Sequence, residues 1–218
     1  LTSHLWQHLP EGNQLIRILS SIRDLGANIA TGAGAYSSTL IERFRVSIPI
    51  ALNIGRVPIN FDQRACQLRT RVLPKALYGC ETAQVPEPLS QSLNAAIADS
   101  ITKKSANRSQ QLLFSTGPSG TDLDVHSNIL FRRVMMLRRM VAKNQNLIQS
   151  IGEIIKDYRS LNYPGVLYDH TDFHNLKPAP SHQRHLWSPP FPPRGPIGFL
   201  LLAVHQVGGV LDESCVIY

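Results

Sequence analysis

Basic side chains at helical spacing are the residues of this sequence most suited to a chemical task, the binding of phosphates. Arg64, Arg71 and Lys75 follow one another at intervals of seven and four residues. A helix of about 3.6 residues per turn places such residues on one stripe. We expect this stripe to contact a polyanion, with Tyr78 near its end either stacking or packing. The alternative is a basic helix face that only meets solvent.

A second basic group lies further along the chain. Four arginines fall within eight residues, and the guanidinium fork matches the geometry of a phosphate group. Salt bridges to neighbouring acids are the alternative, although few acids lie nearby in sequence. We expect two of the arginines to point away from the apolar helix face and two to flank it. The candidate nucleic-acid-binding residues of this group are Arg132, Arg133, Arg138 and Arg139.

Histidines and acids offer two weaker candidate sites for metal ions. The histidine spacing in a proline-rich stretch allows zinc geometry, but no cysteine is close. Ordinary surface histidines are therefore the preferred interpretation. Asp122 and Asp124 are expected to cap the following helix rather than to hold a cation. We predict no metal ligand and no catalytic residue in the chain. The four histidines are His170, His174, His182 and His185.

The charge distribution favours a polyanionic partner. The 218-residue chain has a formal net charge of +7 and a pI near 9.6. Residues 40–80 contain seven basic and two acidic residues, and residues 101–160 contain ten and four. Three widely spaced cysteines indicate a reducing, intracellular setting, nuclear or cytoplasmic. The longest apolar run, residues 197–211, is too short to span a bilayer, and no membrane partner is expected. The first residue, Leu1, and the last, Tyr218, indicate a fragment of a longer protein.

Apolar periodicity predicts helices over most of the chain. Residues 15–19 and 22–29 are expected as two short strands, and residues 161–196 as an irregular proline-rich segment. Pro49 and Pro74 lie inside expected helices and should kink or split them. The expected helices cover residues 39–53, 60–79, 86–102, 128–142, 147–160 and 197–207. The first should begin at a capping box on Thr39. Its expected apolar face contains Leu40, Phe44, Ile48, Ala51 and Leu52, and that of the helix at 128–142 contains Leu130, Phe131, Val134, Leu137 and Val141.

Two motifs resemble the non-LTR (LINE-like) retroelement reverse transcriptases. Residues 22–29 contain the Asp-Leu-Gly of the strand that closes the palm in that family, and residues 71–81 resemble the end of a thumb helix. The resemblance implies a C-terminal thumb and connector fragment that grips a template–primer duplex. The two adjacent palm aspartates of the family are absent from the sequence, so the parent activity, RNA-directed DNA polymerisation, is not expected of this chain alone. Magnesium is expected only in the missing palm.

These observations give one combined expectation. The fold is mainly α, a helical bundle with a short N-terminal strand pair and a proline-rich irregular C-terminal segment. We divide it into a palm-like strand region (1–35), a helical thumb and connector bundle (36–160), and a linker with a terminal helix (161–218). Its partners are a template–primer duplex and the upstream palm and fingers of the same polyprotein. The alternative is a helical protein-interaction module or a decayed retroelement remnant with no activity.

Overall fold

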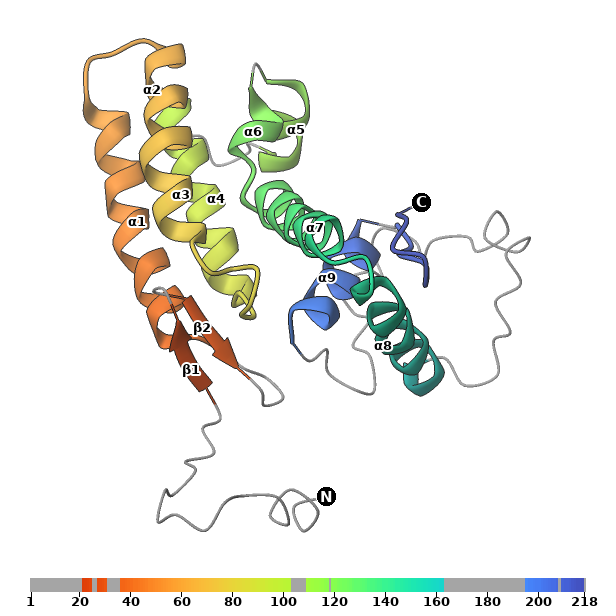
Figure 1. The fold of residues 1–218 in the computed structure, drawn as a ribbon. Coiled ribbons are helices and arrows are strands. Elements are labelled where there is room, and N and C mark those ends of the chain that lie inside the picture. The colour runs from red at the N-terminus through yellow and green to blue at the C-terminus, as the bar shows by residue number, and fades with distance from the viewer. Residues whose placement is uncertain are drawn as a thin grey trace, which may run out of the picture.

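Helices dominate the part of the chain that the structure describes (Figure 1). The computed structural model describes residues 21–24, 27–30, 36–102, 109–117, 119–162, 195–207 and 209–217. The expectation of a mainly α chain is confirmed. The expected strand at 15–19, the candidate histidines and most of the proline-rich segment lie outside the described residues. The helices are α1 (Ser38–Arg56), α2 (Phe61–Gln67), the π-helical turn η1 (Leu68–Val72), α3 (Leu73–Leu77), α4 (Glu87–Ile101), α5 (Gln110–Thr116), α6 (Gly120–Leu123), α7 (Val125–Lys143), α8 (Leu147–Asn162) and α9 (Gly195–Gln206).

The only two strands among the described residues lie next to each other near the N-terminus. β1 (Ser21–Asp24) pairs antiparallel with β2 (Ala27–Ala30), so that Asp24 lies opposite Ala27. The segment 22–29 therefore contributes to two strands instead of the single one expected.

Helix α1 is longer than predicted and passes through its proline. Ser37 is the N-cap and accepts a hydrogen bond from Leu40 N–H, so the expected cap at Thr39 is wrong by two residues. Pro49 lies on the exposed side of the helix. Water can therefore donate a hydrogen bond to the carbonyl oxygen four residues earlier, which the proline nitrogen cannot. The predicted split at Pro49 is therefore wrong. Leu40, Phe44 and Ala51 are buried as expected, whereas Leu52 is exposed.

The run from α2 to α3 accommodates Pro74 with a π-helical turn. Asn60 and Gln63 form a capping box at its start, and Leu73 N–H donates to Leu68 O five residues back. Pro74 follows at once, and a wider turn relieves the clash of its ring with the preceding carbonyl. The helical run thus continues through η1 rather than breaking. It ends at Leu77 with Tyr78 as its C-cap, and Gly79 follows with a positive φ of 89°, which suits glycine.

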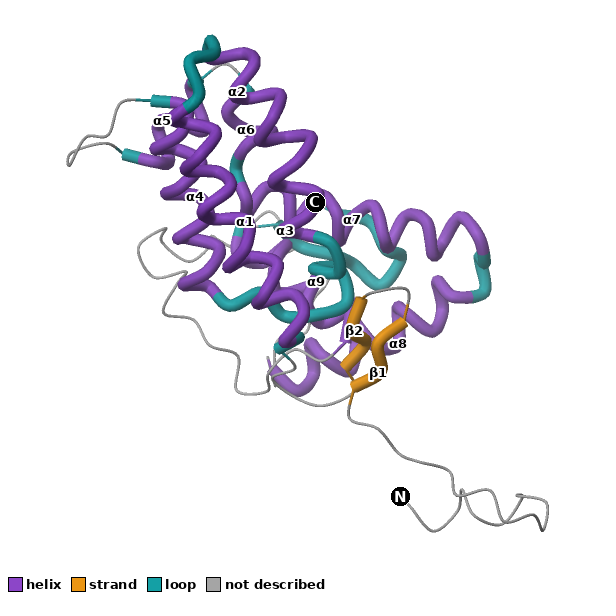
Figure 2. Tube along the Cα trace, turned by 90° about the vertical axis from the view of Figure 1, so that its left-hand side faces the viewer, coloured by secondary structure: helices purple, strands orange, loops and turns teal. Residues whose placement is uncertain are grey.

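The described helices bury two hydrophobic clusters, which α7 connects. The first contains Phe44 of α1, Leu68 of η1 and Ile97 of α4, and the second contains Ile155 of α8 and Leu200 of α9. Helix α7 contributes its first half to the first cluster and its second half to the second. Figures 1 and 2 show α1, α2–α3 and α4 side by side, with α8 and α9 at the other end of α7.

Helix α9 packs against helices on the other side of the boundary expected at residue 161. Helix α9 contacts both α7 and α8, although the expected boundary at residue 161 separates it from them in sequence. Helical packing therefore extends across that point. The division into three segments itself stays a prediction.

Candidate nucleic-acid interface

Arg71 and Lys75 lie on the outer face of the η1–α3 run. Both side chains are exposed, and neither forms an ion pair or hydrogen bond with any residue that the structure describes. The opposite face of the same run is buried through Val72 and Ala76, which fixes the helix against the first cluster. The two cations are therefore held on a rigid support and lack a carboxylate partner within the described chain.

Arg64 does not share that face. Its Nη1 donates to Ser100 O at 3.3 Å and its Nη2 donates to Val57 O at 3.2 Å. Between Arg64 and Arg71 the chain enters a π turn, which contains more residues than an α-helical turn. The regular rotation of about 100° per residue therefore no longer holds between these two arginines. The predicted three-residue stripe is thus divided. Arg64 ties the start of the run to the end of α4 and is not a free surface cation.

Arg69 is a further exposed cation of the same helical run. It is exposed, but its Nη1 lies 3.2 Å from Asp122 Oδ2, so its charge is already paired. Sequence reasoning did not select Arg69, because the regular helical spacing excludes it from the stripe.

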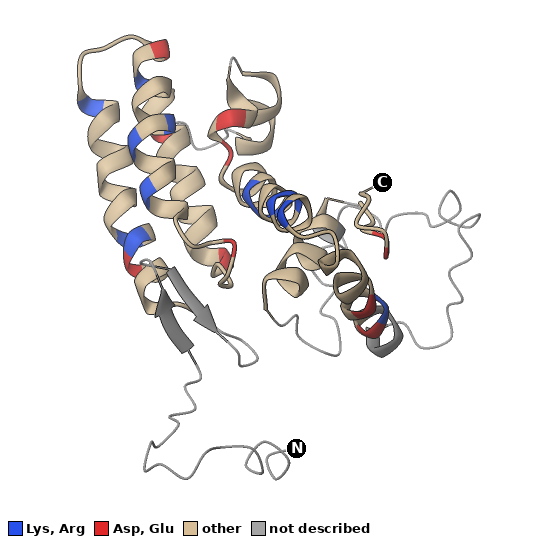
Figure 3. Ribbon diagram, in the orientation of Figure 1, with Lys and Arg blue, Asp and Glu red and all other residues tan. Residues whose placement is uncertain are grey.

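The four arginines of α7 separate into three environments. Arg138 and Arg139 are exposed and make no described ion pair or hydrogen bond. Arg132 Nη1 lies 3.5 Å from Glu81 Oε1, and both side chains are about three-quarters buried. Figure 3 shows basic residues along α2 and α3 and near the middle of α7, with acidic residues at α6 and in the turn after α3 lying between them. Two of the four predicted residues, Arg138 and Arg139, are therefore available to an anion.

The prediction that Arg133 binds nucleic acid is wrong, because only 5% of its surface is exposed. Its Nε, Nη1 and Nη2 donate to the carbonyl oxygens of Cys80, Phe199 and Ala83 at 3.2, 3.0 and 3.4 Å. Burial lowers the pKa of its guanidinium. Arg133 therefore joins chain segments and does not reach a surface phosphate.

The sequence contained a signal for this burial. Arg133 lies four residues after Ile129 and four before Leu137, and all three are buried. The predicted core face of α7 included Phe131, which is 62% exposed. The buried face is therefore rotated from the predicted one, toward the stripe that contains Arg133.

Tyr78 and Arg43 form a contact between α3 and α1 near the exposed cations. Arg43 Nη1 donates to Tyr78 O at 2.7 Å, and its guanidinium carbon lies 4.8 Å from the centroid of the Tyr78 ring. Tyr78 remains 45% exposed. Sequence reasoning left its role open between stacking and packing, and it did not find Arg43, because the two residues are 35 positions apart.

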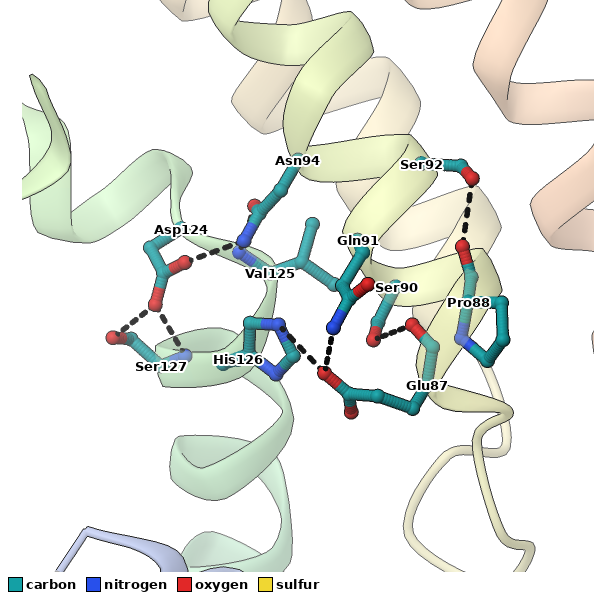
Figure 4. Close-up of polar contacts among 10 residues, drawn as sticks. All are labelled: Glu87, Pro88, Ser90, Gln91, Ser92, Asn94, Asp124, Val125, His126 and Ser127. Atoms are coloured by element: carbon teal, nitrogen blue, oxygen red, sulfur yellow. Dashed lines mark hydrogen bonds and ion pairs between the residues drawn. The ribbon is translucent and has the colours of Figure 1, made fainter. Parts of the chain in front are cut away.

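A polar pocket of about 600 Å³ lies among α4, α5, α6 and α7. Figure 4 shows Asp124 and His126 pointing toward side chains of α4. Asp124 Oδ2 accepts from Ser127 N–H at 2.8 Å, which confirms its expected role as a helix cap. His126 Nε2 lies 3.8 Å from Glu87 Oε1. Among the described residues no hydrogen bond links Ser127 to His126, so the contacts of Asp124 and Ser127 cap a helix and assemble no nucleophile–base pair.

The remaining reactive groups of the described chain give no catalytic arrangement. Cys80 is fully buried, and burial, followed by the charge of Glu81, raises the pKa of its thiol to about 12. No group of three or more potential metal ligands occurs among the described residues. Within the same residues, every helix is too short or too polar to cross a bilayer.

The described part of the chain is thus mainly helical, and the predicted basic residues that stay exposed without a described partner lie on the η1–α3 run and on α7. Comparison of the chain with protein-family models, curated proteins and solved structures found no match. The resemblance of its motifs to reverse transcriptases therefore remains a prediction from the sequence.

Proposed function

We propose that this chain binds nucleic acid through the phosphates of a duplex, as the thumb segment of a retroelement RNA-directed DNA polymerase would bind its template–primer. The observation that carries the proposal is that the described chain holds exposed cations without carboxylate partners on two anchored helices. Of the residues predicted from the sequence, the ones that meet this description are Arg71, Lys75, Arg138 and Arg139. Arg64, Arg132 and Arg133 are left out, because the chain's own oxygens already engage them.

A surface cation without a carboxylate partner gains more from a phosphate contact than a cation that is already paired. A paired cation such as Arg69 must give up its carboxylate to bind an anion, whereas Arg71 gives up only solvent. Phosphate contacts release condensed counterions, so the resulting affinity falls steeply with salt. Such contacts position a duplex but do not read its sequence. We therefore expect binding that depends on salt and little on sequence, with no catalytic role for this chain.

The test is the affinity of the full chain for an RNA–DNA hybrid duplex, measured by fluorescence anisotropy over a series of salt concentrations. Two double variants remove the proposed contacts, Arg71→Ala with Lys75→Ala and Arg138→Ala with Arg139→Ala. Each should make the slope of log affinity against log salt shallower by about 2, because each contact contributes about 0.9. Their folding is checked by circular dichroism.

The matched control is Arg56→Ala with Lys156→Ala. It also removes two exposed positive charges, but from the end of α1 and from α8. A purely non-local effect of net charge would change all three double variants equally. Equal slopes in the three variants and the unaltered chain, or no binding by the folded chain, would refute the proposal.

A protein-interaction module is the second candidate function. The observation that favours it is the 62% exposure of Phe131, a large apolar side chain on α7 seven residues before Arg138. An exposed aromatic side chain on a rigid helix suits a protein partner. A folded chain that binds no duplex at low salt would favour this function over the first.

A further inference from the structure

We propose that Tyr78, backed by Arg43, is a stacking site for an unpaired nucleobase next to the bound duplex. The proposal rests on the proposed nucleic-acid-binding function and deepens it by naming a base contact. It starts from one unusual pair of contacts. A single guanidinium donates to the carbonyl oxygen of Tyr78 and also lies over the ring of the same residue.

The double contact holds the tyrosine in one place. Tyr78 is the C-cap of α3, and Gly79, with its positive φ, turns the chain immediately afterwards. Arg43 comes from α1, which packs along α3, so its hydrogen bond of 2.7 Å fixes the last residue of one helix to the side of another. A ring held in this way loses little conformational freedom when a ligand stacks on it.

The exposed part of the ring is what a base would use. The guanidinium covers one face at 4.8 Å, and 45% of the residue stays exposed. We infer that the second face belongs to this exposed surface. A planar base placed there would complete a layered arrangement of cation, tyrosine and base. Stacking of this kind accepts any base, because every base has a π face.

The neighbouring cations place a phosphate chain beside the ring. Lys75 precedes Tyr78 by three residues, and residues three or four apart share one side of a helix. Lys75 is exposed without a described partner, and Arg71 lies four residues earlier still. A strand whose phosphates contact these two cations would run toward the tyrosine at the end of α3. The base that meets Tyr78 is therefore at the end of the duplex, where it is free to leave its pair.

The experiment compares two RNA–DNA hybrids, one blunt and one with a short single-stranded extension. The first unpaired base of the extension is the fluorescent analogue 2-aminopurine, whose emission falls when it stacks on an aromatic ring. The full chain should bind the extended hybrid about tenfold more tightly than the blunt one and should quench the analogue. Tyr78→Leu should lose both the preference and the quenching but keep the salt dependence of the remaining phosphate contacts. Tyr78→Phe keeps a ring and should keep both.

One control variant and the comparison of the two hybrids separate this inference from the proposed function. The Arg71→Ala and Lys75→Ala variant should weaken binding to both hybrids and leave their ratio nearly unchanged. Salt-dependent binding with no preference for the extension and no quenching would overturn the stacking site and leave the proposed function standing. Absence of salt-dependent binding to either hybrid would overturn both. If Tyr78→Leu unfolds, Tyr78→Phe and the quenching by the unaltered chain still decide the outcome.

Discussion

Arg133 of α7 binds Phe199 of α9 through both the main chain and the side chain. Its Nη1 donates to Phe199 O at 3.0 Å, and its guanidinium carbon lies 5.6 Å from the centroid of the Phe199 ring. The same guanidinium also reaches the carbonyl oxygens of Cys80 and Ala83 in the turn after α3. One buried cation therefore connects α7 with α9 and with the turn after α3.

The first prediction concerns this connection. Arg133→Met keeps an unbranched apolar stem but removes all three donors, so three carbonyl oxygens at a buried site lose their partner. We expect the free energy of unfolding to fall by about 2–4 kcal/mol, because buried acceptors without a donor cost about 1–3 kcal/mol each and partly rearrange. Urea unfolding followed by circular dichroism measures it. Arg138→Met on the exposed side of α7 is the control and should change stability by less than about 0.5 kcal/mol. Equal effects would contradict the structural role of Arg133.

The second prediction concerns the reactivity of the thiols. Cys66 is exposed, whereas Cys80 is buried and the pKa of its thiol is raised from 9.0 to about 12. At pH 8 a thiol-specific reagent should therefore modify Cys66 rapidly and Cys80 only after unfolding. The variants Cys66→Ser and Cys80→Ser assign the phases of the reaction. A fast phase that disappears in Cys80→Ser would disprove the prediction.

The third prediction follows from the direction of that pKa shift. The folded state holds the Cys80 proton more tightly than the unfolded chain, whose thiol titrates near 9.0. Between pH 9 and about 12 the unfolded state therefore binds fewer protons, and the free energy of unfolding falls as pH rises. Cys80→Ala removes this contribution and should make the decline above pH 9 less steep than in the unaltered chain. Urea unfolding at pH 8, 9 and 10 tests this, and identical slopes would refute it.

The fourth prediction concerns the close approach of α1 and α4. A Cβ added at Gly55 would lie 2.7 Å from Ser100 Cα, which belongs to the backbone and cannot move aside without shifting a helix. Helix propensity alone would make Gly55→Ala stabilising by about 1 kcal/mol. We expect the clash to prevail and to cost about 1–3 kcal/mol. Thermal unfolding measures the effect, with Arg45→Ala on the exposed face of α1 as control. A raised melting temperature in Gly55→Ala would rule out such close packing.

The fifth prediction concerns Asn94, which joins α4 to the start of α7. Its Nδ2 donates to Asp124 Oδ1 and its Oδ1 accepts from Val125 N–H, both at 2.8 Å. Asn94→Ala leaves a buried N–H without an acceptor and should cost about 2 kcal/mol in chemical unfolding. Gln91→Ala, one turn away on the exposed side of α4, should have little effect. A loss at Gln91 as large as at Asn94 would contradict this account.

The helices themselves follow largely from local sequence. The apolar spacing in residues 39–53 and 128–142 predicted α1 and α7, because such spacing needs only neighbours within one chain segment. Asp124 was predicted as a cap for the same reason, since a cap bonds to a residue three positions away. The split expected at Pro49 does not occur, and at Pro74 the run continues through a π turn, because whether a proline breaks a helix depends on its exposure and on such a turn. Neither feature is encoded in the spacing of apolar residues.

The sequence alone determined the mainly α fold, the positions of most helices and the basic character of two of them, since each of these depends on residues close together in the chain. Only the tertiary structure decided which basic residues remain available. Arg133 is engaged by carbonyls 50 to 66 residues away, and Arg69 by an acid 53 residues away. Arg71 and Lys75 stay exposed, because the described helices bring no acid to them. Partners distant in sequence become neighbours only when helices pack, so the charge that a surface finally presents is a property of the packed fold.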